Sequence, residues 1–115
     1  MARADVFWVN IPYPKGAAGR EQAGWRPAIA VQSNSSSNLP TVIIVPATTK
    51  MSALRFPHTI EVKPSKTNGF NQTSVLLVFQ LRAIDKNRIV RKIGRLEPAY
   101  MEKLEKEIKN LLELD

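Results

Sequence analysis

The residues with the clearest chemical potential lie between Gly19 and Pro27, in the order Gly-Arg-Glu-Gln-Ala-Gly-Trp-Arg-Pro. Pro27 fixes its own φ angle and disfavours helical angles in the residue before it, so Arg26 is expected in extended backbone. A polar loop therefore becomes a strand at Arg26, and stiff backbone carries its guanidinium. Glu21 supplies an acid in the same loop. The alternative is a surface loop in which an arginine and a glutamate pair for structural reasons alone.

The charge of the chain points to a negatively charged partner. Lysine and arginine outnumber aspartate and glutamate by 17 to 10, which gives a net charge of +7. The stretch 97–115 holds six acids against three lysines, so the rest of the chain carries +10. A basic body of this kind suits a polyanion such as a nucleic acid. A basic protein without such a partner is the alternative, and no basic amphipathic helix favours a membrane surface.

Several kinds of site are excluded by what the chain lacks. It has no cysteine, which removes disulfides, thiolate zinc sites and a cysteine nucleophile. Its one histidine, His58, cannot form a histidine pair within one chain, and we interpret it as structural or solvent-facing. The carboxylates outside the acidic end are scattered, and no glycine loop of the nucleotide-binding type is present. We therefore predict no metal and no cofactor.

Arginine, threonine, one acid and a basic surface can nevertheless cleave RNA. RNA carries its own nucleophile, the 2′-hydroxyl, so a protein has only to align it, stabilise the phosphorane and manage two protons. Such a reaction requires no metal ion. DNA would be spared, because it lacks this hydroxyl.

The pattern of apolar residues predicts a chain of short strands followed by one helix. Branched and aromatic residues, bounded by turn-forming residues, mark the strands. The predicted strands are 6–10, 26–32, 41–47, 58–62, 74–79 and 88–96. Pro46 should end the central pairing of the third strand, so that Thr48 lies just beyond the strand end. Apolar residues at helical spacing from Leu96 to Leu112, with Pro98 in the first turn, predict the helix.

These elements suggest a small mainly β barrel with a C-terminal helix, built as a single domain over 1–115. The runs Val42–Val45 and Val75–Phe79 are continuously apolar, whereas a strand in a sheet with one solvated face should alternate. Both faces of these strands therefore need cover. Since one helix cannot cover both strands, we predict a homodimer.

Four segments, read in order, resemble the MazF/PemK toxins, the ribonuclease halves of bacterial toxin–antitoxin pairs. The first is the arginine loop 21–27, and the second is the third predicted strand with its flanks, 40–49. The segments 56–62 and 79–86 match later blocks of that family. The resemblance covers nearly the whole chain, from Asp5 to the end helix, and four blocks in register make it specific.

The resemblance implies an SH3-like barrel with a C-terminal helix, acting as a homodimeric, metal-independent endoribonuclease on short sequences in single-stranded RNA. The products would carry a 2′,3′-cyclic phosphate and a free 5′-hydroxyl. By position, Arg26 and Thr48 form the catalytic pair, and Glu21 is a secondary candidate. Arg26 would stabilise the charge of the scissile phosphate, and Thr48 would bind the phosphate or help protonate the leaving oxygen. Glu21 would accept the 2′-hydroxyl proton, or merely hold an arginine.

A wider set of residues is predicted to contact the RNA: Gln22, Trp25, Thr49, Lys50, Gln80, Arg82 and Lys86. Trp25 could stack on an unpaired base or pack against its own loop, and Gln80 could read a base edge or be a buried amide. The basic run from Arg82 to Arg95 could line the RNA path, face an acidic partner or be a solvated surface.

The implied partner is an acidic, MazE-like antitoxin whose disordered tail folds across the basic groove. Without a signal peptide or a membrane segment, the expected location is the cytoplasm.

Two other functions remain open on the sequence alone. One is an RNA-binding barrel without catalysis, which would not need Arg26 and Thr48 together. The other is a gyrase poison of the CcdB type, which shares the fold but acts through an aromatic C-terminal tail. This chain ends in Leu-Glu-Leu-Asp, which argues against the second alternative.

Overall fold

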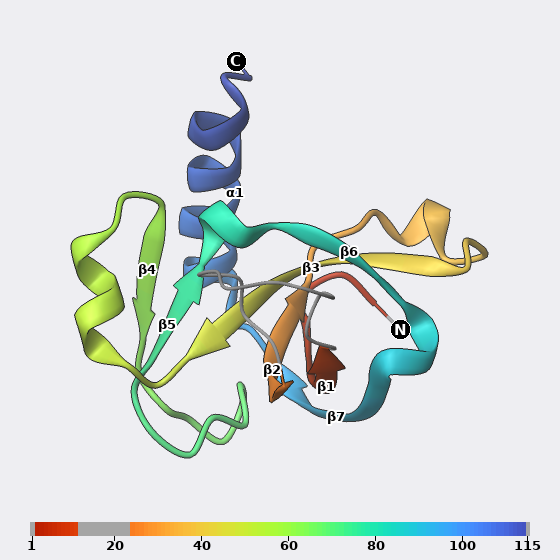
Figure 1. Ribbon diagram of the computed structural model, residues 1–115, viewed down its shortest axis with the longest axis horizontal. Helices are drawn as coiled ribbons and strands as arrows, with labels where there is room; N and C mark the ends of the chain where they lie inside the picture. Colours follow the sequence, from red (N-terminus) through yellow and green to blue (C-terminus); the bar gives the residue numbers. More distant parts are fainter. Residues whose placement is uncertain (1, 12–23, 115) are drawn as a thin grey trace, which may run out of the picture.

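Strand β3, Thr41–Thr48, runs through the middle of the fold (Figure 1). The computed structural model describes residues 2–11 and 24–114. The remaining strands within that part are β1 (Asp5–Ile11), β2 (Gly24–Ala30), β4 (Thr59–Val62), β5 (Ser74–Leu77), β6 (Arg82–Asp85) and β7 (Ile89–Arg95). Helix α1 spans Pro98–Leu112, and four short 3-10 helices are η1 (Asn34–Ser36), η2 (Met51–Arg55), η3 (Val78–Gln80) and η4 (Lys86–Arg88).

The strands form one strongly curved antiparallel sheet in the order β4-β5-β3-β2-β1-β7, with β6 paired to β3 beside β5. No pairing joins β4 to β7 among the described residues, so the barrel-like sheet stays open. In Figure 1, β4 and β5 lie on one side of β3, and β2, β1 and β7 lie on the other. The predicted fold class, mainly β with a C-terminal helix, is confirmed.

Two buried clusters of apolar side chains fill the two faces of the curved sheet. One joins Val45 of β3 and Leu76 of β5 to Leu104 of α1. The other joins Ile44 of β3 to Phe7 of β1. Because successive residues of a strand point to opposite faces, Ile44 and Val45 of β3 serve different clusters, which accounts for much of its apolar run. Ile43 in the same run is exposed.

The apolar run of β5 is also covered within the chain, which corrects one step of the sequence argument. Leu76 packs in the cluster under α1, while Val75 and Leu77 are buried as well, and η2 contacts β5. A second subunit is therefore not required to cover this strand. Helix η2, which contacts β5, was not predicted, because five residues of 3-10 helix carry no strong periodic signal. The homodimer itself stays a prediction.

Other differences from the predicted elements have local causes. The fourth strand begins after His58, whose φ of +59° lies in the left-handed region. The fifth ends at Leu77, where η3 begins. The short strand β6 was not predicted. It has four residues and only one of them is buried, so its sequence cannot be distinguished from that of a charged loop.

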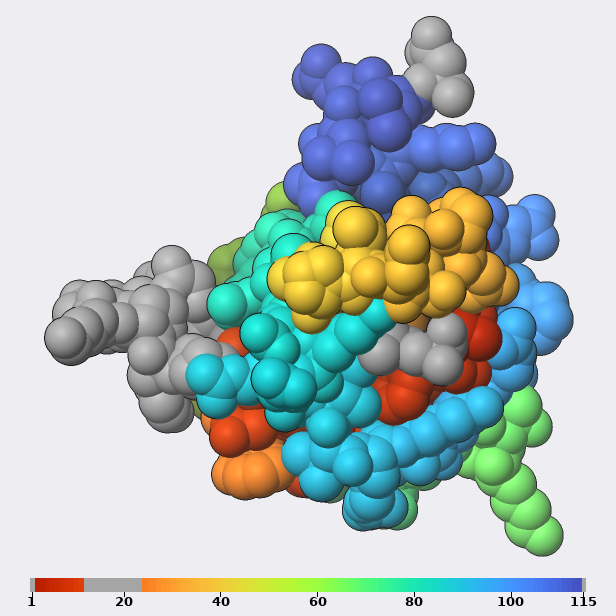
Figure 2. Space-filling model, turned by 90° about the vertical axis from the view of Figure 1, so that its right-hand side faces the viewer, coloured from red at the N-terminus to blue at the C-terminus, as the bar shows by residue number. Residues whose placement is uncertain are grey.

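The tip between β2 and β3, residues 33–40, is fastened to the stretch that contains η4 (Figure 2). Backbone N–H of Lys86 donates to the carbonyl of Pro40 at 3.1 Å, and its ammonium donates to the carbonyl of Ser37. In Figure 2 the orange-yellow tip lies against the cyan chain of β6 and η4. Lys86 is thus engaged in holding two loops together.

The loop between β4 and β5 is built around the fully buried amide of Asn68. Its oxygen accepts from the backbone N–H of Ser65 and of Phe70, at 3.1 and 3.0 Å. Its nitrogen donates to the Lys63 carbonyl and to the Glu97 carboxylate, at 3.0 and 3.1 Å. The four bonds satisfy this amide and tie the loop to the start of α1.

The same loop passes so close to β7 that only glycine fits at the contact. Gly69 has a φ of +77°, and a Cβ atom there would lie 1.9 Å from the Ile93 carbonyl oxygen. On the other side, a Cβ at Gly94 would lie 2.4 Å from the Asn68 carbonyl group. The loop therefore has one position relative to β7.

We expect Gly69→Ala to lower the free energy of unfolding by about 3 kcal/mol or more, because the added methyl group clashes with backbone. Gly24→Ala is the matched control, since Gly24 also has a positive φ, +84°, but an added Cβ there would have no atom of the described residues within 4 Å. It should cost about 1 kcal/mol, the strain of the left-handed conformation alone. Chemical denaturation of both variants measures the difference, and equal losses would contradict the close contact.

Candidate active site

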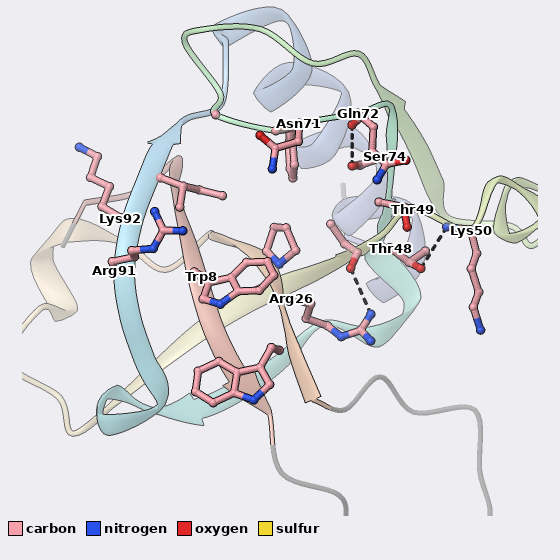
Figure 3. Close-up of a pocket in the computed structure, with 16 residues that line it drawn as sticks. Trp8, Arg26, Thr48, Thr49, Lys50, Asn71, Gln72, Ser74, Arg91 and Lys92 are labelled. Carbon is pink, nitrogen blue, oxygen red and sulfur yellow. Dashed lines mark hydrogen bonds between the residues drawn. The ribbon is translucent and has the colours of Figure 1, made fainter.

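A cavity of about 690 Å³ lies where the end of β3 faces β1, β2 and β7 (Figure 3). The loop after Asn68 forms its remaining wall. Four cationic side chains line it, and none of its described lining residues is an acid; the four are Arg26, Lys50, Arg91 and Lys92. A cavity with this lining attracts anions.

Strand pairing brings Arg26 and Thr48 together. Ala28 of β2 lies opposite Pro46 of β3, and continuing that register by two residues sets Arg26 opposite Thr48. Both side chains line the cavity. Two residues separated by 22 positions in the chain thus become neighbours through the β2–β3 register.

The Arg26 guanidinium donates to a backbone carbonyl of β3 that Pro27, which has no N–H, cannot satisfy. The N–H of Val31 donates to the Ile43 carbonyl at 3.0 Å, so every second residue of β3, including Ala47, turns its carbonyl toward β2. Continuing the β2–β3 register by one residue sets Pro27 opposite Ala47, and Pro27 has no N–H to donate. The Ala47 carbonyl instead accepts a hydrogen bond from Nη1 of Arg26 at 3.2 Å (Figure 3).

Thr48 is held by the turn that follows it. Its Oγ1 accepts a hydrogen bond from the backbone N–H of Lys50 at 3.2 Å (Figure 3). A hydroxyl that accepts one bond can still donate its own proton. Thr48 is therefore oriented at the strand end with a proton to offer toward the cavity.

A tryptophan lies on the sheet side of the cavity. Trp8 of β1 pairs with Pro27 of β2 on one side and with Arg91 of β7 on the other. All three line the cavity, and Trp8 is half-buried. This cross-strand row of Pro27, Trp8 and Arg91 places an aromatic side chain between a proline and a cation.

One cavity cation has a buried counter-charge. Nζ of Lys92 lies 3.1 Å from Oδ1 of Asp5, as does Nη1 of Arg95, and the N–H of Ala2 donates to Oδ2 at 2.9 Å. Burial raises the pKa of Asp5, but the Ala2 hydrogen bond and the two cations outweigh it, and the pKa is lowered overall. Asp5 stays ionised and anchors Lys92 at the cavity edge.

The structure gathers five of the predicted site residues around this cavity: Trp25, Arg26, Thr48, Thr49 and Lys50. Two others, Glu21 and Gln22, lie outside the described residues. Trp25 has 58% of its surface exposed.

Three predicted RNA-binding residues lie elsewhere. Gln80 belongs to η3, which contacts α1, and Arg82 lies opposite Ile44 on the far stretch of β3. Lys86 donates to the tip at Ser37. None of the three lines the cavity. The register of β6 against β3, which the sequence did not reveal, separates them from Arg26.

The other cavity residues were missing from the predicted site, among them Trp8, Asn71 and Arg91. Trp8 was interpreted only as a strand residue, and Asn71 was not singled out. Arg91 belonged to the basic run, which could not be distinguished from a solvated face. An aromatic residue on the partly polar face of β1 was the one available signal, since Trp8 alternates with the buried Phe7 and Val9.

His58 has the structural role expected of it, with Nδ1 3.1 Å from Oε2 of Glu107 in α1. Residues 2–11 and 24–114 contain no group of three histidine, cysteine or acidic side chains that could hold a metal ion. Within the same residues, no helix has the length and apolar character needed to cross a membrane.

The chain matches a known family of toxins. The family described as "PemK-like, MazF-like toxin of type II toxin-antitoxin system" matches residues 2–112. The chain belongs to this family, as the four sequence segments predicted.

Two curated relatives extend the match along the whole chain. Endoribonuclease EndoA of Bacillus subtilis is 31% identical over 115 residues, covering 99% of this chain and 96% of that protein. Endoribonuclease MazF of Staphylococcus saprophyticus is 30% identical, covering 99% and 89%.

Solved structures share the fold at lower identity. MazF from Deinococcus radiodurans has a TM-score of 0.79 at 18% identity, covering 99% of this chain and 97% of that one. A mycobacterial endoribonuclease, solved in complex with its cognate antitoxin, has a TM-score of 0.78 at 20% identity and covers 100% and 97%.

Pro27→Ala should redirect the hydrogen bond at Ala47. The new N–H at position 27 faces the Ala47 carbonyl and competes with the Arg26 guanidinium for it. We expect the amide at 27 to be protected from hydrogen exchange and the Arg26 side chain to become more mobile in NMR relaxation. In the control, Pro46→Ala, the new amide faces the edge of β3 away from β2, so the Arg26 side chain should keep its mobility. Fast exchange at position 27 would contradict the assigned role of Pro27.

Proposed function

We propose that this chain cleaves single-stranded RNA at short sequences without a metal ion, through attack by the 2′-hydroxyl on the adjacent phosphate. The products would be a 2′,3′-cyclic phosphate and a 5′-hydroxyl. In enzyme class the chain is an endoribonuclease of the MazF type, in common with its curated relatives. The finer chemistry is our proposal, supported by one observation: Arg26 and Thr48 meet in a cationic cavity with no acid among its described lining residues.

In the proposed reaction the O2′ atom loses its proton and bonds to phosphorus, and the 5′-oxygen leaves and gains a proton. Arg26 donates hydrogen bonds to the phosphate oxygens, whose charge grows in the phosphorane. A free-arginine pKa above about 12 makes proton transfer by this group costly, so its contribution is electrostatic.

Thr48 is suited to the leaving side of the reaction. Its Oγ1 already accepts from Lys50, which leaves its O–H directed outward to bind a phosphate oxygen or the departing 5′-oxygen. Glu21, as proposed from the resemblance, accepts the 2′-hydroxyl proton. Trp25, exposed at the cavity edge, offers a face on which an unpaired base can stack.

Arg26→Ala should lower kcat by on the order of 10²-fold or more, because it removes the main charge stabilisation of the phosphorane. The measurement is cleavage of a long single-stranded RNA in excess EDTA, with the fragment ends identified chemically. Arg55→Ala is the matched control, because it also removes one guanidinium. The Arg55 side chain is exposed, lies over the Phe56 ring and does not line the cavity. It should cleave at close to the normal rate.

Each other outcome selects a different function. Fragments that persist with Arg26→Ala would keep the nuclease and overturn its site. RNA that is bound but left intact would favour a binding module. Inhibition of gyrase with intact RNA would favour the CcdB type of toxin.

We further propose an acidic antitoxin as the protein partner, acting in the cytoplasm where both would be made. A structural neighbour is described as an endoribonuclease in complex with its cognate antitoxin. An acidic segment would be attracted to the same four cavity cations that would bind RNA phosphates, and would thereby block them.

A homodimer is the expected assembly. Apolar side chains remain exposed on β3 and on the tip before it, at Ile43 and Leu39, with 38% and 46% of their surfaces accessible. Light scattering of the purified chain should give about twice the 12.9 kDa of one chain. A mass of one chain at micromolar concentration would contradict the dimer.

A further inference from the structure

We infer that Asn71 is a specificity-determining residue, which reads one unpaired base of the RNA while that base stacks on Trp8. The inference rests on the proposed function and adds to it the means by which one position of the cleaved sequence is chosen. It concerns the wall of the cavity formed by the 63–73 loop and β1.

Trp8 supplies the stacking surface. Its ring is half-buried, so its position is fixed by the sheet, and it lines the cavity between Pro27 and Arg91 in the cross-strand row. Stacking of a base on an aromatic side chain accepts any base, since every base has a π face. Trp8 can therefore hold a base but cannot choose among bases.

Asn71 supplies the choice. Its residue is exposed, and in Figure 3 its amide extends from the loop toward Trp8 and the side of the cavity where Arg91 lies. A primary amide offers two donors and an acceptor with two lone pairs, which suits the donor–acceptor edge of a base. The neighbouring cations lack acceptors and suit phosphate oxygens instead.

The loop that carries Asn71 is built to hold this position. Three residues before it, Asn68 is fully buried with four side-chain hydrogen bonds, and the next residue, Gly69, is pressed against the Ile93 carbonyl. Phe70 is buried in the main cluster. An amide on so constrained a loop loses little conformational freedom on binding, which favours recognition.

The experiment measures which sequences are cleaved. Wild-type chain and the variants Asn71→Ala and Asn71→Asp are incubated with a pool of single-stranded RNA randomised in sequence, and kcat/KM is obtained for each base at each position. Asn38→Asp is the matched control, because it introduces the same charge at an exposed asparagine outside the cavity. Asn71 is exposed, so its replacement should leave the fold intact.

Asn71→Ala should lower kcat/KM for the preferred base at one position by about tenfold or more and leave the other positions unchanged. Asn71→Asp should shift that position toward guanine, because a carboxylate accepts from both the N1–H and the N2 amino group of guanine. Asn38→Asp should cut the same sequences as the wild type. Unchanged preference in both Asn71 variants would overturn the inference and leave the proposed nuclease standing.

Binding separates this inference from the proposed chemistry. The two tryptophans of the chain, Trp8 and Trp25, both line the cavity, so their fluorescence reports RNA binding without cleavage. Short RNAs that differ in one base are titrated into Arg26→Ala chain with and without Asn71→Asp. In one outcome, the wild type fails to cleave any RNA while Asn71→Asp still shifts the binding preference toward guanine in these titrations. In that case the nuclease chemistry fails and the role of Asn71 holds. If no titration discriminates among bases, the role of Asn71 fails.

Discussion

The missing N–H of Pro27 is the constraint on which the geometry of the site depends. An ordinary residue at this position would extend the β2–β3 ladder and satisfy the Ala47 carbonyl from the backbone. With proline there, the carbonyl accepts from Arg26, and the guanidinium is drawn across toward the end of β3. Pro46 has the complementary effect on the other edge, where it lies between the pairing with β6 and the pairing with β5. Two prolines thus end one ladder and divide another, and the cavity opens beside them.

The opposite wall depends on close packing instead. The Asn68 amide, Gly69 and Gly94 hold the 63–73 loop against β7, and the Glu97 carboxylate links it to the start of α1. Ser65 completes this link by donating to the same carboxylate at 3.0 Å. Because the loop is packed on the main apolar cluster through Phe70, the stability of the core and the position of this wall are coupled.

How much of the fold and of the site the sequence could predict depends on how far apart in the chain the interacting residues lie. Local rules sufficed for Arg26 before Pro27, for Thr48 near a strand end and for the amphipathic helix, since each depends on near neighbours in the chain. Trp8, Arg91 and Asn71 needed the register of β1 with β7 and the fold of a loop, and β1–β7 contains two irregularities that no alternation pattern reveals. Lys86 was assigned to RNA for its charge, but its ammonium binds the tip.

In the proposed reaction, the two walls would divide the work of recognition in a way that follows from their chemistry. Cations carried on strands and strand ends can bind phosphates of any sequence, because every nucleotide presents the same charge. An amide on the packed loop can distinguish bases, because each base edge differs in its donors and acceptors. Arg26 is positioned by the β2–β3 register and Asn71 by the contact with β7, so the two depend on different parts of the sheet. Substitutions at position 71 can therefore change which RNA is cut while the Arg26–Thr48 pair, which would perform the cleavage, keeps its geometry.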